Sequence, residues 1–426
     1  MRFVAWSFVA DKVDDACAVS MQHAAHVRAR SACAIARRRS TQVSAQPAAI
    51  MARTLGWVIP PISQWWYNPR MTAAPLYREV PAAVQTAYAE LYELVQIAET
   101  ARSPAFVTGT VAYKTIKGAR YAYWAFKELD GRKREYYLGP AGPAIDAIER
   151  ARTAGAPALD AVARQAAAAL AQGCTATPPK HFRIVKRLSE YQFFRAGGIL
   201  VGTHAFLALG NQLGVTWGSG ARTLDLDFAH AGPHGNVSVA LPADLRANAH
   251  DALTSLEHGF LPSLGGSKGM ASLYVSAREP ELRIDFLTAA RRNGRDEVKA
   301  PELGVSLSPL KFLDYLIEGP GQAVLLDRAD AVLVNLPDPA RYGLHKLIVA
   351  HERGTRHAKY GKDIAQALAL IEWHLQRAPH ALVDAWSDLA ARGAGWLKRA
   401  RASLKLVPQA QQEIVTRFAQ AVSLRK

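Results

Sequence analysis

The pattern of apolar and polar positions divides the chain into helical and strand-like segments. Over residues 80–101, apolar side chains recur every three or four positions, which is the period of an amphipathic helix. Pro81 suits the first turn of that helix. Residues 144–172 are rich in alanine and predict a second helical region. The two segments therefore predict a helix on each side of residues 106–140.

Residues 106–140 have the pattern of a small antiparallel β unit. Apolar and polar residues alternate, Gly118 marks one turn, and Asp130-Gly131 is a strong hairpin signal. Basic residues gather at the turns, between aromatic residues: Lys114, Lys117, Arg120, Arg132, Lys133 and Arg134. We expect them to bind nucleic acid, because phosphates pair with basic side chains and bases stack on aromatic rings. The alternative is a half-buried sheet with a solvated basic face.

Strands and helices alternate in the next part of the chain. After the linker "GCTATPPK", the pattern predicts a helix, the short strand "GGILVG", and a helix from about Thr203 to Leu213. The strands "TLDLDFA" and "LRIDFLT" follow. Beyond residue 305 the pattern is mostly helical, with one strand-bearing insert. The whole predicts an α+β fold.

The strand "TLDLDFA" places two carboxylates on one face. Asp225 and Asp227 lie two positions apart, and the interleaved Leu224, Leu226 and Phe228 are expected to bury the opposite face. Neighbouring carboxylates repel each other unless a cation lies between them. Taken alone, the same alternation is also typical of a solvated edge strand.

Two further segments favour a site for metal and phosphate. Gly202 and Thr203 stand where a strand ends and a helix begins, so that bare backbone and free N–H groups can approach a phosphate. Asp285 lies in the alternating strand "ELRIDFLT". Carboxylates converging from neighbouring strands supply the oxygen ligands that two Mg²⁺ ions need. Such a metal pair activates an attacking oxygen and stabilises a departing pyrophosphate.

These segments, with "PARYGLHKLIV", resemble the polymerase-β-like nucleotidyltransferase superfamily, and within it a poorly characterised bacterial group. The resemblance covers roughly residues 180–380 and implies a mixed β-sheet flanked by helices, a nucleoside triphosphate such as ATP as donor, and Mg²⁺ or Mn²⁺. It implies that Asp225 and Asp227 bind both metals. Asp285 would bind the catalytic metal and help to deprotonate the acceptor hydroxyl, and Gly202 and Thr203 would hold the triphosphate.

Two features depart from the family pattern. Thr203 replaces the usual Gly or Ser, and the spacing from Thr203 to Asp225 is longer than in the commonest members. Both departures bear on the phosphate contacts and leave the three aspartates in place.

A basic helical stretch after residue 339 supplies candidates for the other nucleotide contacts. Lys346 is expected to bind a β- or γ-phosphate as a point charge. Lys362 either forms an ion pair with Asp363 or reaches the triphosphate. For each residue singly, a solvated basic helix face is the alternative. The histidines here lack the H-E-x-x-H spacing of a zinc site.

Other functions fit the pattern less well. A glycosyltransferase with a D-x-D metal site needs no third aspartate strand and no Gly-Thr helix start. A glycosidase places its two carboxylates on separate strands, about 5 Å or more apart. A nucleic-acid-binding protein on a catalytically degenerate nucleotidyltransferase scaffold is the stronger alternative. The three aspartates argue against it, because clustered carboxylates are costly without a metal.

Charge and cysteine content extend this interpretation. Lys and Arg outnumber Asp and Glu by 52 to 36, a net charge of +16, which favours an anionic partner unless coding bias explains the arginines. We expect RNA (tRNA included) or a protein hydroxyl as the acceptor, with a neutralising partner protein if the chain resembles toxin–antitoxin nucleotidyltransferases. Three cysteines without a C-x-x-C pair, and no apolar run of about 18 residues, favour a cytoplasmic location without a membrane span.

The expected organisation has four parts. Residues 1–70 form a basic leader that we expect to be disordered, or else a nucleic-acid-binding arm, and the natural start is expected at Met51 or Met71 rather than Met1. The other parts are an N-terminal helix and β-hairpin region, the catalytic domain and a helical C-terminal domain, over residues 71–178, 179–305 and 306–426.

Overall fold

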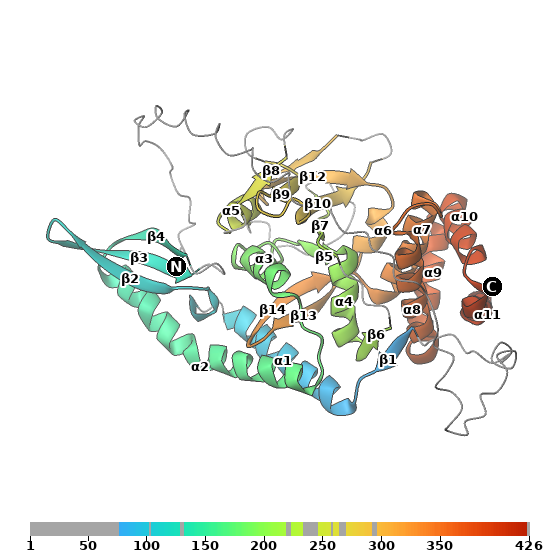
Figure 1. Cartoon of the computed structure of the whole chain (residues 1–426), viewed down its shortest axis with the longest axis horizontal. Helices are drawn as coiled ribbons and strands as arrows, with labels where there is room; N and C mark the ends of the chain where they lie inside the picture. The colour runs from blue at the N-terminus through green and yellow to red at the C-terminus, as the bar shows by residue number, and fades with distance from the viewer. Residues whose placement is uncertain are drawn as a thin grey trace, which may run out of the picture. The chain divides into compact units, whose positions relative to one another are not determined.

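A computed structural model describes most of the chain after residue 75 (Figure 1). The described residues are 76–101, 104–127, 132–218, 223–232, 246–256, 259–263, 270–291 and 296–423. The expected leader, both candidate start methionines and the Asp130-Gly131 turn lie outside them. The chain divides into residues 1–70 and 71–426, and only the second unit contains described residues.

The N-terminal part consists of two helices and a three-stranded antiparallel sheet in the order β2-β3-β4. Its elements are β1 (Tyr77–Glu79), α1 (Ala82–Ala101), η2 (Pro104–Phe106), β2 (Thr110–Ile116), β3 (Ala119–Lys127), β4 (Lys133–Pro140) and α2 (Pro143–Gln172). The apolar stripe of α1, which includes Leu91 and Val95, is buried together with Val162 and Ala166 of α2. The two predicted helices and the β unit are confirmed.

A mixed sheet in the order β11-β12-β10-β7-β5 forms the centre of the next part. Its elements and their flanking helices are α3 (Pro179–Glu190), β5 (Ile199–Val201), α4 (Gly202–Gln212), β6 (Val215–Trp217), β7 (Leu226–Ala229), α5 (Ala249–Thr254), β8 (Phe260–Pro262), β9 (Leu273–Ser276), β10 (Arg283–Ala289), β11 (Val298–Ala300) and β12 (Val305–Leu310). Strand β10 runs parallel to β7 and β12, whereas β5 runs antiparallel to β7. The hairpin β8–β9 joins the sheet through β10, and β6 pairs with β1.

The last part of the chain is a β-hairpin followed by a group of helices, drawn in orange and red in Figure 1. Its elements are α6 (Leu313–Ile317), β13 (Gly321–Asp327), β14 (Asp330–Leu336), α7 (Pro339–Arg353), α8 (Tyr360–Arg377), α9 (Pro379–Ala391), α10 (Ala394–Lys405), η4 (Gln409–Gln411) and α11 (Gln412–Ser423). The Tyr88 hydroxyl accepts a hydrogen bond from the Val324 amide at 2.9 Å, which ties the hairpin to α1. No helix in the described part of the chain is long and apolar enough to cross a bilayer.

The largest core lies under the central sheet. Phe228 of β7 stacks on Phe286 of β10 with ring centroids 5.8 Å apart, and Phe193 packs edge-on against both. All three rings are fully buried. Since side chains alternate along a strand, these phenylalanines turn the residues before them, Asp227 and Asp285, to the opposite face. The fold is thus the expected α+β arrangement, a mixed sheet flanked by helices.

Candidate active site

Two of the three predicted aspartates lie side by side on neighbouring parallel strands. Asp227 of β7 is directly opposite Asp285 of β10 in the strand register. The flanking Leu226 and Ile284 are fully buried. Both carboxylates therefore project from the same face of the sheet, as the alternation predicts.

Gly202 lies directly against the first of these carboxylates. Its neighbour Val201 is opposite Asp227 in the pairing of β5 with β7. Gly202 has a φ of +66°, and a Cβ atom there would come within 2.0 Å of Asp227 Oδ2. A side chain at this position would be strained and would displace the carboxylate. Among the described residues, no side chain caps the N-terminus of α4, which begins at Gly202.

Burial and mutual repulsion make the two carboxylates reluctant to ionise. Burial raises the pKa of Asp285 to about 6, with further contributions from the charges of Asp227 and Asp225. Burial also raises the pKa of Asp227, and the nearby Lys346 ammonium opposes that rise. A cation bound between such carboxylates would relieve both effects.

Asp225 is placed differently from the other two aspartates. It precedes β7, which begins at Leu226, and its carboxylate Oδ2 accepts a hydrogen bond from Lys359 Nζ at 3.0 Å. Leu224 is 45% exposed, so the expectation that it shares the buried face with Leu226 and Phe228 is wrong. The regular strand begins only at Leu226, so the alternation of side chains does not extend back to Leu224.

Basic side chains from α7 and α8 surround the aspartates. Lys346 Nζ donates to Asp363 Oδ1 at 2.9 Å, and Arg353 pairs with the other oxygen of the same carboxylate. Lys362 Nζ donates to the Thr203 hydroxyl at 2.9 Å. Burial, followed by the charges of Lys346 and Lys359, lowers the pKa of Lys362.

These contacts bear on the two roles considered for Lys362. The Asp363 carboxylate is occupied by Lys346 and Arg353, and Lys362 donates a hydrogen bond to Thr203 at the start of α4. Lys362 therefore lies beside the predicted phosphate-binding backbone. Arg341, three residues into α7, instead pairs with Asp388 at 2.7 Å and with Glu318, away from the aspartates.

Two further residues hold this arrangement together: Tyr342, which the sequence pattern did not single out, and Asp363, which it considered only as a partner of Lys362. The Tyr342 hydroxyl donates to the Gly202 carbonyl at 2.7 Å, which fixes α7 against the start of α4. Asp363 is fully buried and anchors both Lys346 and Arg353. Tyr342 and Lys346 lie four residues apart on α7, so helical spacing from Lys346 is the signal that could have indicated Tyr342.

The donor chemistry of the aspartates fits a hard divalent cation. Carboxylate oxygens are the preferred ligands of Mg²⁺ and Mn²⁺. The raised pKa values of Asp227 and Asp285 reflect burial first and neighbouring carboxylates second. No group of three or more His, Cys, Asp or Glu side chains in the described ranges is arranged as a metal site. One oxygen of the third carboxylate, Asp225, accepts a hydrogen bond from Lys359 instead.

The six basic residues predicted to bind nucleic acid lie on the other, three-stranded sheet. Lys114 is on β2, Lys117 is in the β2–β3 turn and Arg120 is on β3. Lys133 and Arg134 are on β4, and Arg132 directly precedes it. They form a separate candidate surface rather than part of the aspartate site.

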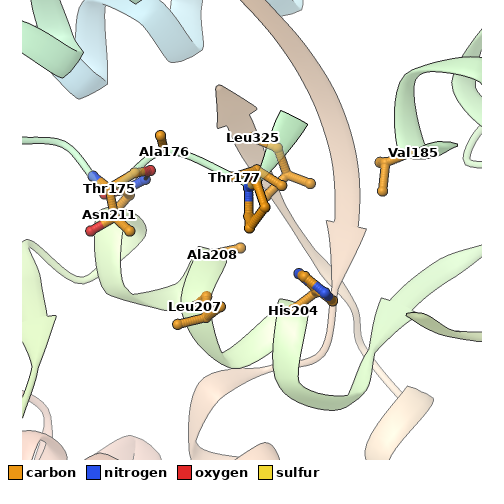
Figure 2. Close-up of a pocket in the computed structure, with 10 residues that line it drawn as sticks. Thr175, Ala176, Thr177, Val185, His204, Leu207, Ala208, Asn211 and Leu325 are labelled. Carbon is orange, nitrogen blue, oxygen red and sulfur yellow. Dashed lines mark hydrogen bonds between the residues drawn. The ribbon is translucent and has the colours of Figure 1, made fainter. Parts of the chain in front are cut away.

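A small pocket beside α4 is too small to hold a nucleotide (Figure 2). It is lined by His204, Asn211, Thr177 and Leu325 among others, and its cavity volume is about 10 Å³. A small-molecule site typically needs hundreds of cubic ångströms, whereas this volume holds about one water. Burial lowers the pKa of His204 to about 3, so its imidazole is neutral.

Comparison with protein families finds a match that agrees with the geometry. Residues 180–391 match a family model described as nucleotidyltransferase. Among solved structures, an antigenic nucleotidyltransferase-like protein from Paracoccidioides brasiliensis matches at 15% identity, over 54% of this chain and 95% of that one, with a TM-score of 0.24. A search of curated proteins found no match.

Proposed function

This chain belongs to the nucleotidyltransferase superfamily, and we propose that it transfers a nucleoside monophosphate from a nucleoside triphosphate to an acceptor hydroxyl in the presence of Mg²⁺ or Mn²⁺. The observation that carries the proposal is the pairing of Asp227 with Asp285 on parallel strands, with the bare backbone of Gly202 against Asp227. This arrangement joins carboxylates for a metal to a helix start for phosphate.

The three aspartates are the proposed metal ligands. When bound, the metal neutralises charge on the triphosphate and on the departing pyrophosphate. Asp225 would hold the metal through a carboxylate that now accepts a hydrogen bond from Lys359, so Lys359 would have to give up this contact. Lys359 released in this way becomes a further positive charge for the donor phosphates.

The remaining residues position phosphates and move one proton. The amides at Gly202 and Thr203, with the Lys346 and Lys362 ammonium groups, hold the triphosphate. The Asp285 carboxylate accepts the proton of the acceptor hydroxyl. The hydroxyl oxygen then bonds to the α-phosphorus, the bond from that phosphorus to the bridging oxygen breaks, and its electron pair leaves with pyrophosphate.

The acceptor is proposed to be RNA, tRNA included, because a net charge of +16 favours a polyanion. A protein hydroxyl is the other acceptor class, and with it a neutralising partner protein of the kind found in toxin–antitoxin pairs. The products of the reaction distinguish the two classes directly.

The test is a transfer assay with purified chain. Each nucleoside triphosphate, radiolabelled at the α-phosphate, is incubated with Mg²⁺ or Mn²⁺ and total bacterial RNA, and the products are separated on a gel. Metal-dependent label in an RNA or protein band supports the proposal and identifies donor and acceptor class. No label with any donor, together with RNA retained on a filter, would favour the nucleic-acid-binding alternative on a degenerate scaffold.

A further inference from the structure

The two faces of the β2-β3-β4 sheet have different surroundings. One face is packed against α2: the Tyr113 hydroxyl donates to Glu149 at 2.9 Å, and the Arg152 guanidinium lies 5.0 Å from the Trp124 ring centroid. Ala122, on the same face, is fully buried. In Figure 1 the sheet lies beside the N-terminal half of α2. This face is therefore partly covered by α2.

The opposite face carries a group of three tyrosines. Tyr121 and Tyr123 alternate along β3, and Tyr137 of β4 is directly opposite Tyr123. The Tyr137 ring centroid lies 6.0 Å from that of Tyr121 and 5.5 Å from that of Tyr123. Tyr137 is 44% exposed. We call Tyr121, Tyr123 and Tyr137 the tyrosine platform.

Lysines surround the tyrosine platform on the same face. Lys114 of β2 is opposite Tyr121, and its ammonium lies 4.7 Å from the Tyr123 ring centroid. Lys133 is opposite Lys127 at the other end of the sheet. Glu135 pairs with Lys114 and Lys133, so three lysines face one carboxylate and the face is net positive.

This placement separates the predicted basic residues into two groups. Lys114 and Lys133 lie on the platform face. Arg120 lies on the packed face, where its guanidinium is 3.7 Å from the Tyr113 ring centroid. The platform face combines three grouped tyrosine rings with exposed lysine side chains.

We propose that the tyrosine platform binds single-stranded RNA. Unpaired bases offer flat faces that stack on tyrosine rings, and their phosphates pair with Lys114, Lys127 and Lys133. Double-stranded RNA has its bases stacked inside the helix and cannot use the rings in this way. The positive charge and the aromatic surface together favour a polyanion with exposed bases.

The sheet is attached to the helix that leads into the candidate active site. The Thr108 hydroxyl and amide donate to Glu190 at the end of α3, at 2.8 and 3.0 Å. The Arg187 guanidinium of α3 lies 4.5 Å from the Phe126 ring centroid. The chain continues from α3 into β5 and Gly202. A role for the platform in presenting an RNA acceptor rests on the proposed function, whereas RNA binding itself does not.

The test is binding of a fluorescein-labelled, unstructured RNA of about 12 nucleotides, followed by anisotropy without nucleotide or metal. Tyr137→Ala is expected to weaken binding about 10-fold or more, and Tyr137→Phe to retain it, because the ring supplies the stacking. The matched control is Tyr136→Ala. Tyr136 is the neighbouring residue, is 41% exposed, and stacks on Phe126 on the other face of the sheet.

The outcomes separate this proposal from the catalytic one. Weakened binding in Tyr137→Ala, with Tyr136→Ala unchanged and both variants melting like the wild type, supports the platform. Equal losses in both variants, or no loss in either, would overturn it, as would a duplex of the same sequence that binds as tightly as the single strand. Because the assay needs no transfer, running it in the Asp227→Ala chain shows whether RNA binding stands when catalysis fails.

Discussion

At the scale of single residues, the site depends on how closely backbone and carboxylate approach each other. Gly202 has no Cβ, and Asp227 Oδ2 occupies the space where one would be. Asp285 stands opposite Asp227 and shares its burial and its negative charge. The sequence alone indicated these three positions, because glycine at a strand end and alternating aspartates are local signals.

Replacing Gly202 with alanine should impair transfer more than stability. The new methyl group would push the Asp227 carboxylate aside, since it would lie 2.0 Å from Oδ2. We expect at least a 100-fold loss of transfer rate, of the order that follows misplacement of a reacting group by about 1 Å. The matched control is Gly319→Ala, at a φ of +62° with open space around it. Equal transfer rates in the two variants would contradict the account.

The stability of the metal-free protein should depend on pH through Asp285. Its pKa is raised from 3.8 to about 6 in the folded state, so the folded protein holds this proton more tightly than the unfolded chain. The energetic cost of ionising Asp285 is therefore absent below pH 4, grows between about pH 4 and 6, and is complete above that. Asp285→Asn removes it.

We expect Asp285→Asn to raise the free energy of unfolding by about 1–3 kcal/mol at pH 8 and to change it little near pH 4. Urea denaturation in the presence of EDTA measures both values. A gain of the same size at the two pH values would show that ionisation of Asp285 is not its cause.

At the scale of elements, the site lies where strands β7 and β10 face the helix pair α7–α8. Alternation predicted the two strands, and periodicity predicted a mostly helical region that contains α7 and α8. Neither pattern could predict that Lys346 of α7 pairs with Asp363 of α8, 17 residues away. Nor could it predict that Lys359 contacts Asp225. Such pairs depend on how two helices dock, which no local pattern encodes. Leu224 shows the same limit, since the strand begins at Leu226, three residues later than the predicted strand "TLDLDFA".

The buried ion pair between α7 and α8 should be costly to break. Asp363→Asn would leave Lys346 and Arg353 next to each other without their shared carboxylate. We expect a loss of about 3 kcal/mol in the free energy of unfolding. The control is Arg399→Gln, which breaks a partly exposed pair with Glu352 on α7 and should cost less than about 1 kcal/mol. Similar losses in urea denaturation would argue against a special role for Asp363.

At the scale of the whole molecule, positive charge and aromatic side chains favour an RNA-binding surface in addition to the aspartate site. The sequence predicted a basic and aromatic β unit, but it could not assign Arg120 to the packed face and Lys114 to the exposed one. That assignment follows from the register of β2 on β3 and from the docking of the sheet on α2. The tyrosine platform and the aspartates together support the proposal that the protein holds RNA and modifies it.

Metal binding should stabilise the whole protein. A cation that binds only the folded state raises the free energy of unfolding by about 2.7 kcal/mol at 100 times its dissociation constant. Saturating Mn²⁺ or Mg²⁺ should therefore raise the melting temperature of the wild type, and Asp227→Asn should abolish the shift because it removes a ligand. An equal shift in Asp227→Asn would place the metal elsewhere.

The proposal that Asp227 holds the metal for nucleotidyl transfer is tested most directly by an initial rate. We would measure label transfer from the preferred α-labelled nucleoside triphosphate in the wild type and in two aspartate variants. Asp227→Ala removes a proposed metal ligand, whereas Asp160→Ala changes an exposed aspartate on α2. We expect metal-dependent transfer by the wild type and by Asp160→Ala. We expect Asp227→Ala to lose transfer while its fold is retained. Transfer by a folded Asp227→Ala at the wild-type rate would contradict the proposal.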